Sequence, residues 1–204
     1  MYEDMNPNNN VYDYTKRIIN KSLSQPKFPV IFLDRDGVIN QSNIINGKPV
    51  APRSFDELKV FKDVVKLNEL SGSGFKIIVI SNQPDVGHKL ISLNEIKKIN
   101  AKINKLIKVD DFFYCFHKQN DNCFCRKPLP GLILKAVLKH NLDLEKSFLL
   151  GDRSSDIELG YNMGCDCSFI NYNYSEAKPL EKMINKKVNS ITEFVDYVKK
   201  SCKN

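Results

Sequence analysis

Two carboxylates with the spacing of a reactive pair stand directly after the apolar segment 29–33. They are Asp34 and Asp36, separated by Arg35. Residues two apart in an extended chain point the same way, so we expect the two acids to share one face and Arg35 to point elsewhere. Neighbouring carboxylates repel, and a proton or a cation must offset their charge. Magnesium takes oxygen ligands and readily bridges to phosphate, so this turn favours phosphoryl chemistry.

In such chemistry Asp34 is the candidate nucleophile, which would attack phosphorus and form an aspartyl-phosphate. Asp36 is the candidate acid and base: it would protonate the leaving oxygen and then deprotonate the hydrolytic water. The competing interpretation is an acidic surface turn that caps a helix. The D-x-D pair alone does not decide between the two, and the rest of the chain must.

Similar apolar segments recur along the chain and end in polar clusters. Further strands are predicted at 75–80, 111–116, 147–150 and 167–170. The second predicted strand leads into Ser81-Asn82-Gln83 and the fourth into Gly151-Asp152. Parallel sheets bind ligands at the carboxyl ends of their strands, so we expect these clusters to converge with Asp34 and Asp36.

Helical patterns separate the predicted strands. They cover residues 60–70, 92–107, 130–140, 154–163 and 191–200, and Ser92 and Glu95 fit a capping box. Strands that alternate with helices predict an α/β fold with a Rossmann-like, doubly wound parallel sheet. We assign this domain to residues 29–204 and interpret 1–28 as a flexible N-terminal extension with a short helix near Val11–Ser22.

Composition limits the class of protein. The chain has 204 residues, of which 42% are hydrophobic and 27% charged, which suits one globular domain. It contains no run of eighteen apolar residues and no secretory signal, so we expect a cytoplasmic protein without a membrane span. The net charge of +7 comes from scattered lysines without interleaved aromatics, so nucleic-acid binding is not favoured. We expect a monomer with a small-molecule substrate.

Four metal-ligating side chains crowd into eleven residues. They are Cys115, His117, Cys123 and Cys125, in the pattern C-x-H followed by C-x-C. Three thiols and one imidazole make a complete tetrahedral zinc set, with no position left for water, so the zinc in this loop at 115–125 would be structural. The alternative is four unconnected residues of a reduced protein. We interpret Cys165 and Cys167 as buried thiols and Cys202 as exposed.

These motifs together resemble the haloacid dehalogenase superfamily of phosphohydrolases. The resemblance spans roughly residues 30–170 and is carried by Asp34-Arg-Asp-Gly-Val, Ser81-Asn-Gln, Lys127, and Gly151-Asp-Arg-Ser-Ser-Asp156 in that order. It implies that Ser81 binds a phosphoryl oxygen and that Lys127 offsets negative charge at phosphorus. It also implies a magnesium ion held by Asp34, Asp152 and the backbone carbonyl of Asp36. Asp156 either orients this loop or caps the next helix.

The cysteine–histidine loop narrows the resemblance to a capless subgroup. This subgroup contains heptose 1,7-bisphosphate 7-phosphatases and histidinol-phosphate phosphatase domains. It implies that Arg126 contacts the distal part of a small substrate. The further substrate-binding residues expected around the entrance and the second motif are Ser42, Asn43, Ile44, Ile45, Asn82 and Gln83.

The chain departs from this subgroup near the second motif. Asp85 replaces a small residue, and His88 stands where an arginine is expected, with Lys89 as a compensating charge. Arg53, in the first loop, is a further candidate near the site. A carboxylate at position 85 does not suit a bisphosphate and favours a cationic substrate. The resemblance nevertheless implies a heptose bisphosphatase, with histidinol-phosphate phosphatase as the alternative and an inactive zinc-containing binding module as the alternative from another class.

Overall fold

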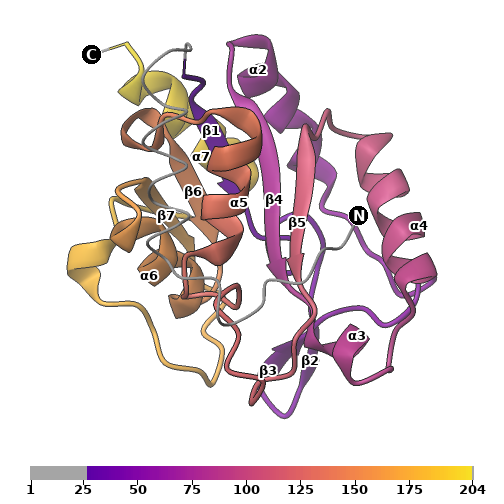
Figure 1. The fold of residues 1–204 in the computed structure, drawn as a ribbon. Coiled ribbons are helices and arrows are strands. Elements are labelled where there is room, and N and C mark those ends of the chain that lie inside the picture. The colour runs from indigo at the N-terminus through magenta and orange to yellow at the C-terminus, as the bar shows by residue number, and fades with distance from the viewer. Residues whose placement is uncertain (1–26, 204) are drawn as a thin grey trace.

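A sheet of six parallel strands forms the centre of the computed structural model, which describes residues 27–203. Its order is β5-β4-β1-β6-β7-β8 (Figure 1). The strands are β1 (Val30–Leu33), β4 (Lys76–Asn82), β5 (Asp111–Cys115), β6 (Phe148–Gly151), β7 (Asp166–Ile170) and β8 (Lys186–Val188). The five predicted strands are confirmed. The sequence did not indicate β8, because two of its three residues are exposed lysines and no apolar run marks it.

Helices cover both faces of the sheet, as the alternating pattern predicts. On one face α2 (Leu67–Gly72), α4 (Leu93–Asn104) and α7 (Ile191–Ser201) pack against Ile31 and Leu33. On the other face α5 (Gly131–His140) and α6 (Ser154–Asn162) pack against Val30 and Phe32. Successive residues of β1 thus enter opposite cores, which confirms a doubly wound α/β sheet. Short 3-10 turns lie at Lys62–Lys66, Leu144–Lys146 and Glu181–Met183.

Two small elements lie at the carboxyl end of the sheet. A two-stranded hairpin joins β2 (Asn43–Ile45) to β3 (Lys48–Val50), where the sequence indicated only loops (Figure 1). The carbonyl of Gly47 at its tip accepts hydrogen bonds from the backbone N–H and the hydroxyl of Ser175, each at 3.0 Å. A single turn of helix, α3 (Pro84–Gly87), follows β4. Both elements border the cavity described below.

The predicted N-terminal extension, with its helix at Val11–Ser22, lies outside the described residues apart from 27 and 28. Phe28 already belongs to the domain, because its N–H donates to the carbonyl of Asn141 at 3.0 Å. Between residues 27 and 203, none of the helices is long and apolar enough to cross a membrane.

Candidate active site

The carboxyl ends of three neighbouring strands bring the predicted acids and the predicted serine together. Asp34 follows β1, Ser81 lies near the end of β4, and Asp152 follows β6. The Asp34 N–H donates to the carbonyl of Leu150 at 3.1 Å, which fixes β1 against β6 at this point. All three side chains are buried. The sheet register therefore places groups more than a hundred residues apart along the chain in one site.

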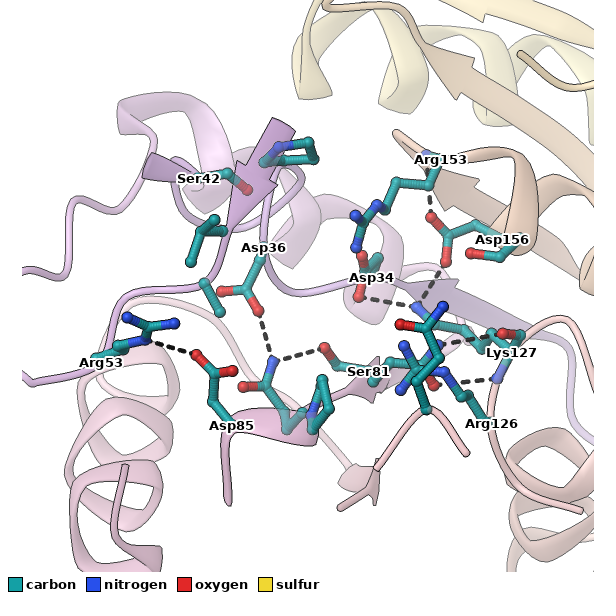
Figure 2. Close-up of a pocket in the computed structure, with 18 residues that line it drawn as sticks. Asp34, Asp36, Ser42, Arg53, Ser81, Asp85, Arg126, Lys127, Arg153 and Asp156 are labelled. Carbon is teal, nitrogen blue, oxygen red and sulfur yellow. Dashed lines mark hydrogen bonds and ion pairs between the residues drawn. The ribbon is translucent and has the colours of Figure 1, made fainter. Parts of the chain in front are cut away.

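Lys127 is the cation at the centre of this site (Figure 2). Its Nζ lies 2.9 Å from Asp34 Oδ1 and 2.6 Å from Asp156 Oδ1. Burial disfavours the charged amine, but Asp156 and Asp34 outweigh it and raise the Lys127 pKa above its ordinary value. The lysine is therefore an ammonium that touches the candidate nucleophile directly. No phosphate-sized gap separates Lys127 from Asp34 in this structure.

Asn82 fixes the backbone of Lys127 from the neighbouring strand. Its Oδ1 accepts the Lys127 N–H at 3.0 Å, and its Nδ2 donates to the Lys127 carbonyl at 3.2 Å. Lys127 Nζ also donates to the carbonyl of Ile80 at 2.9 Å. Asn82 borders the cavity, but both of its polar side-chain atoms bond to the backbone of Lys127. Its contact with substrate therefore stays a prediction.

Three buried carboxylates form a group that fits a divalent cation. Oxygens of Asp34, Asp152 and Asp156 lie within 4.8 Å of one another. Both carboxylate oxygens of Asp152 are buried, and neither has a hydrogen-bond partner of good geometry among residues 27–203. Burial, Asp34 and Asp156 raise the Asp152 pKa well above its ordinary value. Carboxylate oxygens are the ligands that magnesium prefers, and its charge would offset this repulsion, so the residues present fit the ion.

A close approach of the backbone at Gly37 shapes this group. Gly37 has a φ of +92°, and a Cβ added there would lie 1.8 Å from Asp152 Oδ2.

Asp156 serves as both a cap and an ion-pair partner, because its Oδ2 accepts the Arg153 N–H at 3.1 Å at the start of α6. The two roles that the sequence left open for Asp156 therefore coexist.

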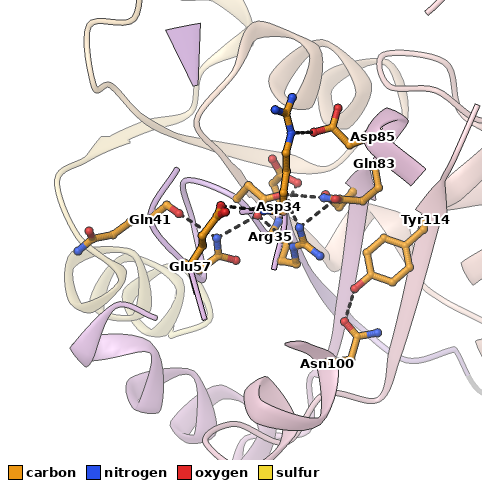
Figure 3. Close-up of polar contacts among 12 residues, drawn as sticks. Asp34, Arg35, Gln41, Glu57, Gln83, Asp85, Asn100 and Tyr114 are labelled. Carbon is orange, nitrogen blue, oxygen red and sulfur yellow. Dashed lines mark hydrogen bonds and ion pairs between the residues drawn. The ribbon is translucent and has the colours of Figure 1, made fainter. Parts of the chain in front are cut away.

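Asp36 lies outside this carboxylate group, and its side chain contacts Arg35 and Gln83, which are labelled in Figure 3. Arg35 donates to both of its oxygens, from Nε at 3.0 Å and from Nη2 at 2.9 Å. Gln83 Nε2 and Asn40 Nδ2 also donate to it, at 2.5 Å and 2.9 Å. The expectation that Arg35 points away from the acids is wrong. The side chain of Asp36 is therefore occupied by these contacts. The backbone carbonyl of Asp36 as a magnesium ligand stays a prediction.

Arg35 is fully buried, and sequence reasoning missed its role. Its guanidinium also donates to Gln83 Oε1 at 2.9 Å and lies 6.0 Å from the centre of the Tyr114 ring. A buried charge must be paired, so an arginine inside a buried acidic turn was the available signal. Gln83 in turn donates to Ser81 Oγ at 2.9 Å. These contacts hold Asp36 and Ser81 in one hydrogen-bonded chain.

A cavity of about 270 Å³ opens above these groups. Cationic side chains reach it from three segments: Arg53, Arg126, Lys127 and Arg153. Arg153 is paired with Glu176, with Nε at 2.8 Å from Oε2. Arg126 keeps Nη1 buried without a hydrogen-bond partner in the described part of the chain. Arg126 is therefore a candidate for binding an anionic ligand.

The predicted entrance residues divide into two sets. Ser42 lines the cavity, together with Ser81, Asn82, Gln83 and Arg126. Asn43, Ile44 and Ile45 are exposed on β2 and do not line it. Ile44 borders a separate hollow beside Phe61 and Tyr172. A role for these three residues in substrate binding stays a prediction.

The four predicted zinc ligands meet at the end of β5. Cys115 Sγ lies 3.5 Å from Cys123 Sγ and 3.6 Å from His117 Nδ1, which lies 3.2 Å from Cys125 Sγ. Ligand atoms around a tetrahedral zinc stand about 3.3–3.8 Å apart, so the set fits that ion with no open position. The closeness of Cys125, together with burial, raises the Cys115 pKa, and a zinc ion would reverse that effect.

The remaining cysteines behave as predicted. Cys165 and Cys167 are buried free thiols, and Cys202 is exposed. Burial raises the pKa of both buried thiols to about 12, which makes them poor nucleophiles.

Comparison with known proteins places these features in a family. The family model described as "Polynucleotide kinase 3 phosphatase" matches residues 29–176. D-glycero-beta-D-manno-heptose-1,7-bisphosphate 7-phosphatase of Helicobacter pylori is 32% identical over 65% of this chain and 77% of its own. D-glycero-alpha-D-manno-heptose-1,7-bisphosphate 7-phosphatase of Photorhabdus laumondii is 31% identical over 79% of this chain and 93% of its own.

A longer relative and a solved structure extend the comparison. The histidine biosynthesis bifunctional protein HisB of Campylobacter jejuni is 34% identical over 66% of this chain but only 39% of its own length. The solved structure of D,D-heptose 1,7-bisphosphate phosphatase from B. bronchiseptica, complexed with magnesium and phosphate, has a TM-score of 0.69 at 21% identity. It covers 85% of this chain and 99% of its own, and at that identity it supports the fold.

Proposed function

This chain belongs to the polynucleotide kinase 3 phosphatase family of haloacid dehalogenase-type phosphatases, and from that premise we propose that it removes the 7-phosphate of D-glycero-D-manno-heptose 1,7-bisphosphate. The observation that carries the proposal is the contact of Lys127 with Asp34 beside the buried Asp152. An ammonium, a nucleophilic carboxylate and an unsatisfied acid at one point are what phosphoryl transfer requires.

In the proposed reaction Asp34 attacks phosphorus while the bond from phosphorus to the sugar oxygen breaks. Asp36 gives its proton to the departing oxygen. It then takes a proton from the water that cleaves the aspartyl-phosphate, which releases phosphate and restores Asp34. Lys127 and the Ser81 hydroxyl hold the phosphoryl oxygens. A magnesium ion on Asp34 and Asp152 would supply further positive charge for the phosphoryl group.

Arg35 has a positioning role in this scheme. Its two contacts with Asp36, together with the one from Gln83, keep the acid at a fixed place beside the cavity. Proton transfer needs a group within hydrogen-bond reach of the reacting oxygen, so this orientation is useful to the reaction.

Two observations favour a substrate with a second anion. Arg126 has a buried nitrogen with no hydrogen-bond partner among the residues that the structure describes, and Arg153 lies at the same cavity. The alternative, histidinol phosphate, was favoured by a free carboxylate at Asp85. That carboxylate is already bound by Arg53 at 2.8 Å, so it offers little to a cationic substrate. The heptose relatives also match this chain over most of their length, whereas HisB is matched over 39%.

An inactive zinc-containing binding module is the competing function of another class. Such a module would lack the nucleophile or the cation-binding acids. Asp34, Asp152 and Lys127 are all buried at the site of the carboxylate group. We therefore retain hydrolysis, and we propose a cytoplasmic monomer in which the zinc loop is structural.

A turnover panel tests the proposal. Hydrolysis is measured with magnesium on heptose 1,7-bisphosphate, histidinol phosphate and nucleoside monophosphates, for the wild type, Asp34→Asn and the exposed control Asp196→Asn. We expect the bisphosphate to be preferred and Asp34→Asn to be inactive but folded, because an amide is a poor nucleophile. Activity retained by Asp34→Asn would remove the mechanism, and a preference for histidinol phosphate would remove the substrate.

A further inference from the structure

An ion pair spans the mouth of the cavity on the side away from Lys127 (Figure 2). Arg53 follows β3, and Asp85 belongs to α3, so the pair connects the hairpin to the end of β4. Arg53 Nε lies 2.8 Å from Asp85 Oδ2, and both residues line the cavity. The pair is therefore part of the wall that faces the substrate.

The Nη groups of Arg53 are available as hydrogen-bond donors. Among the described contacts its guanidinium uses only Nε, and its side chain is 44% exposed. A guanidinium carries five N–H groups in a planar fork, so it can bind one carboxylate through Nε and a second anion through its Nη groups. Asp85 therefore does not consume the binding capacity of Arg53.

The backbone of Arg53 is held in place independently of Asp85. Its N–H donates to Glu57 Oε2 at 3.0 Å, and Asn43 Nδ2 donates to the same oxygen at 3.2 Å. Loss of the Asp85 contact would leave this anchor intact. The side chain alone would then gain rotamer freedom, which costs binding free energy when a ligand immobilises it again.

We propose that Arg53 binds the distal anionic group of the substrate through its Nη groups, and that Asp85 is the positioning residue that holds its Nε. This inference rests on the proposed function and specifies its substrate class: a sugar phosphate with a second phosphate or a comparable dianion. Arg53 would face Arg126 and Arg153 across one cavity. The carboxylate at position 85 then supports recognition of a bisphosphate instead of opposing it.

Selectivity between two substrates tests the assignment. The kcat and KM values are measured with magnesium on heptose 1,7-bisphosphate and on the matching heptose 7-phosphate. The proteins are the wild type, Arg53→Gln, Asp85→Asn and the control Lys187→Gln, which removes an exposed ion pair with Glu181 outside the cavity. The ratio of kcat/KM for the two substrates is the readout.

For Arg53→Gln we expect the bisphosphate preference to fall about tenfold, through KM, because one charged contact is lost. Hydrolysis of the monophosphate should be affected less, because that substrate lacks the distal phosphate. Asp85→Asn should lower the preference by a smaller factor, about threefold, because Arg53 is still present but less ordered. Lys187→Gln should match the wild type.

Three results would overturn the inference while leaving the proposed function in place. They are an unchanged preference in Arg53→Gln, an equal loss of kcat on both substrates, and a stronger bisphosphate preference in Asp85→Asn. The last would mean that Asp85 repels the distal group. A wild type that hydrolyses neither sugar phosphate would instead remove the proposed function, and the inference with it.

Discussion

Replacing Gly37 by alanine tests whether Asp152 holds the cation. A Cβ at position 37 would lie 1.8 Å from Asp152 Oδ2 and 2.4 Å from its Cγ. No heavy atoms approach that closely without a bond, so the Asp152 carboxylate has to move. Gly74 provides a matched control, because its φ of +93° is close to the +92° of Gly37, but a Cβ there meets nothing within 4 Å.

The magnitudes separate backbone strain from damage to the site. Alanine in a left-handed conformation costs about 1–2 kcal/mol, and both variants should lose this much stability. A ligand present at 100 times its Kd stabilises the folded state by about 2.7 kcal/mol. Gly74→Ala should keep that gain with magnesium, whereas Gly37→Ala should lose most of it because one ligand has moved.

Urea unfolding with and without magnesium measures the increase in the free energy of unfolding that magnesium causes, and turnover is recorded in parallel. We expect activity to change in parallel with this stabilisation: both are preserved in Gly74→Ala and nearly absent in Gly37→Ala. An equal magnesium-dependent stabilisation in both variants would show that Asp152 is not a ligand. The carboxylate group would then need another explanation.

Two further outcomes are expected. Cys123→Ser should lower the bound zinc below one equivalent and reduce both the stability and kcat. Metal analysis and urea unfolding measure this, with Cys165→Ser as the control. One full equivalent of zinc in Cys123→Ser would contradict the zinc site. Burial would raise the Asp111 pKa, but Lys139 and His140 hold it below its ordinary value of 3.8. Its stabilising effect is therefore present above pH 3.8 and lost as pH falls through the folded-state pKa. Asp111→Asn should cost about 0.5–1 kcal/mol in urea unfolding at pH 7 and less at pH 3; an equal cost at both values would contradict this.

The strands that the sequence predicted are those marked by an apolar run within the strand itself. The apolar run at β1 and the run at β4 are buried on both faces, so they read as strands without knowledge of their partners. Strand β8 and the hairpin β2–β3 lack such runs, because five of their nine residues are exposed lysines or isoleucines. Strand β8 instead depends on its pairing with β7, and the tip of the hairpin is bound by Ser175, 128 residues further along the chain.

The same distinction applies to the site. The zinc ligands lie within one loop, so their spacing alone indicated the cluster. Arg53 and Asp85 are 32 residues apart, and only the register of the sheet and hairpin places them together. Arg35 illustrates a different difficulty: alternation along an extended strand predicts its direction, but β1 ends at Leu33, so the rule no longer applies to Asp34–Asp36.

The position of Lys127 explains why a structural zinc belongs in this enzyme. The other central groups stand at strand ends, where the sheet fixes them, but Lys127 comes from the long connection between β5 and α5. Long loops without secondary structure sample many conformations, and a catalytic ammonium cannot do so. Cys125 lies two residues before Lys127, and the Cys115 carbonyl accepts the Gln83 N–H at 2.7 Å. With Asn82 on the Lys127 backbone, the zinc cluster and the end of β4 hold this loop from two sides. A zinc ion in this cluster would touch no substrate, and it would thereby help to set the distance between the ammonium and Asp34.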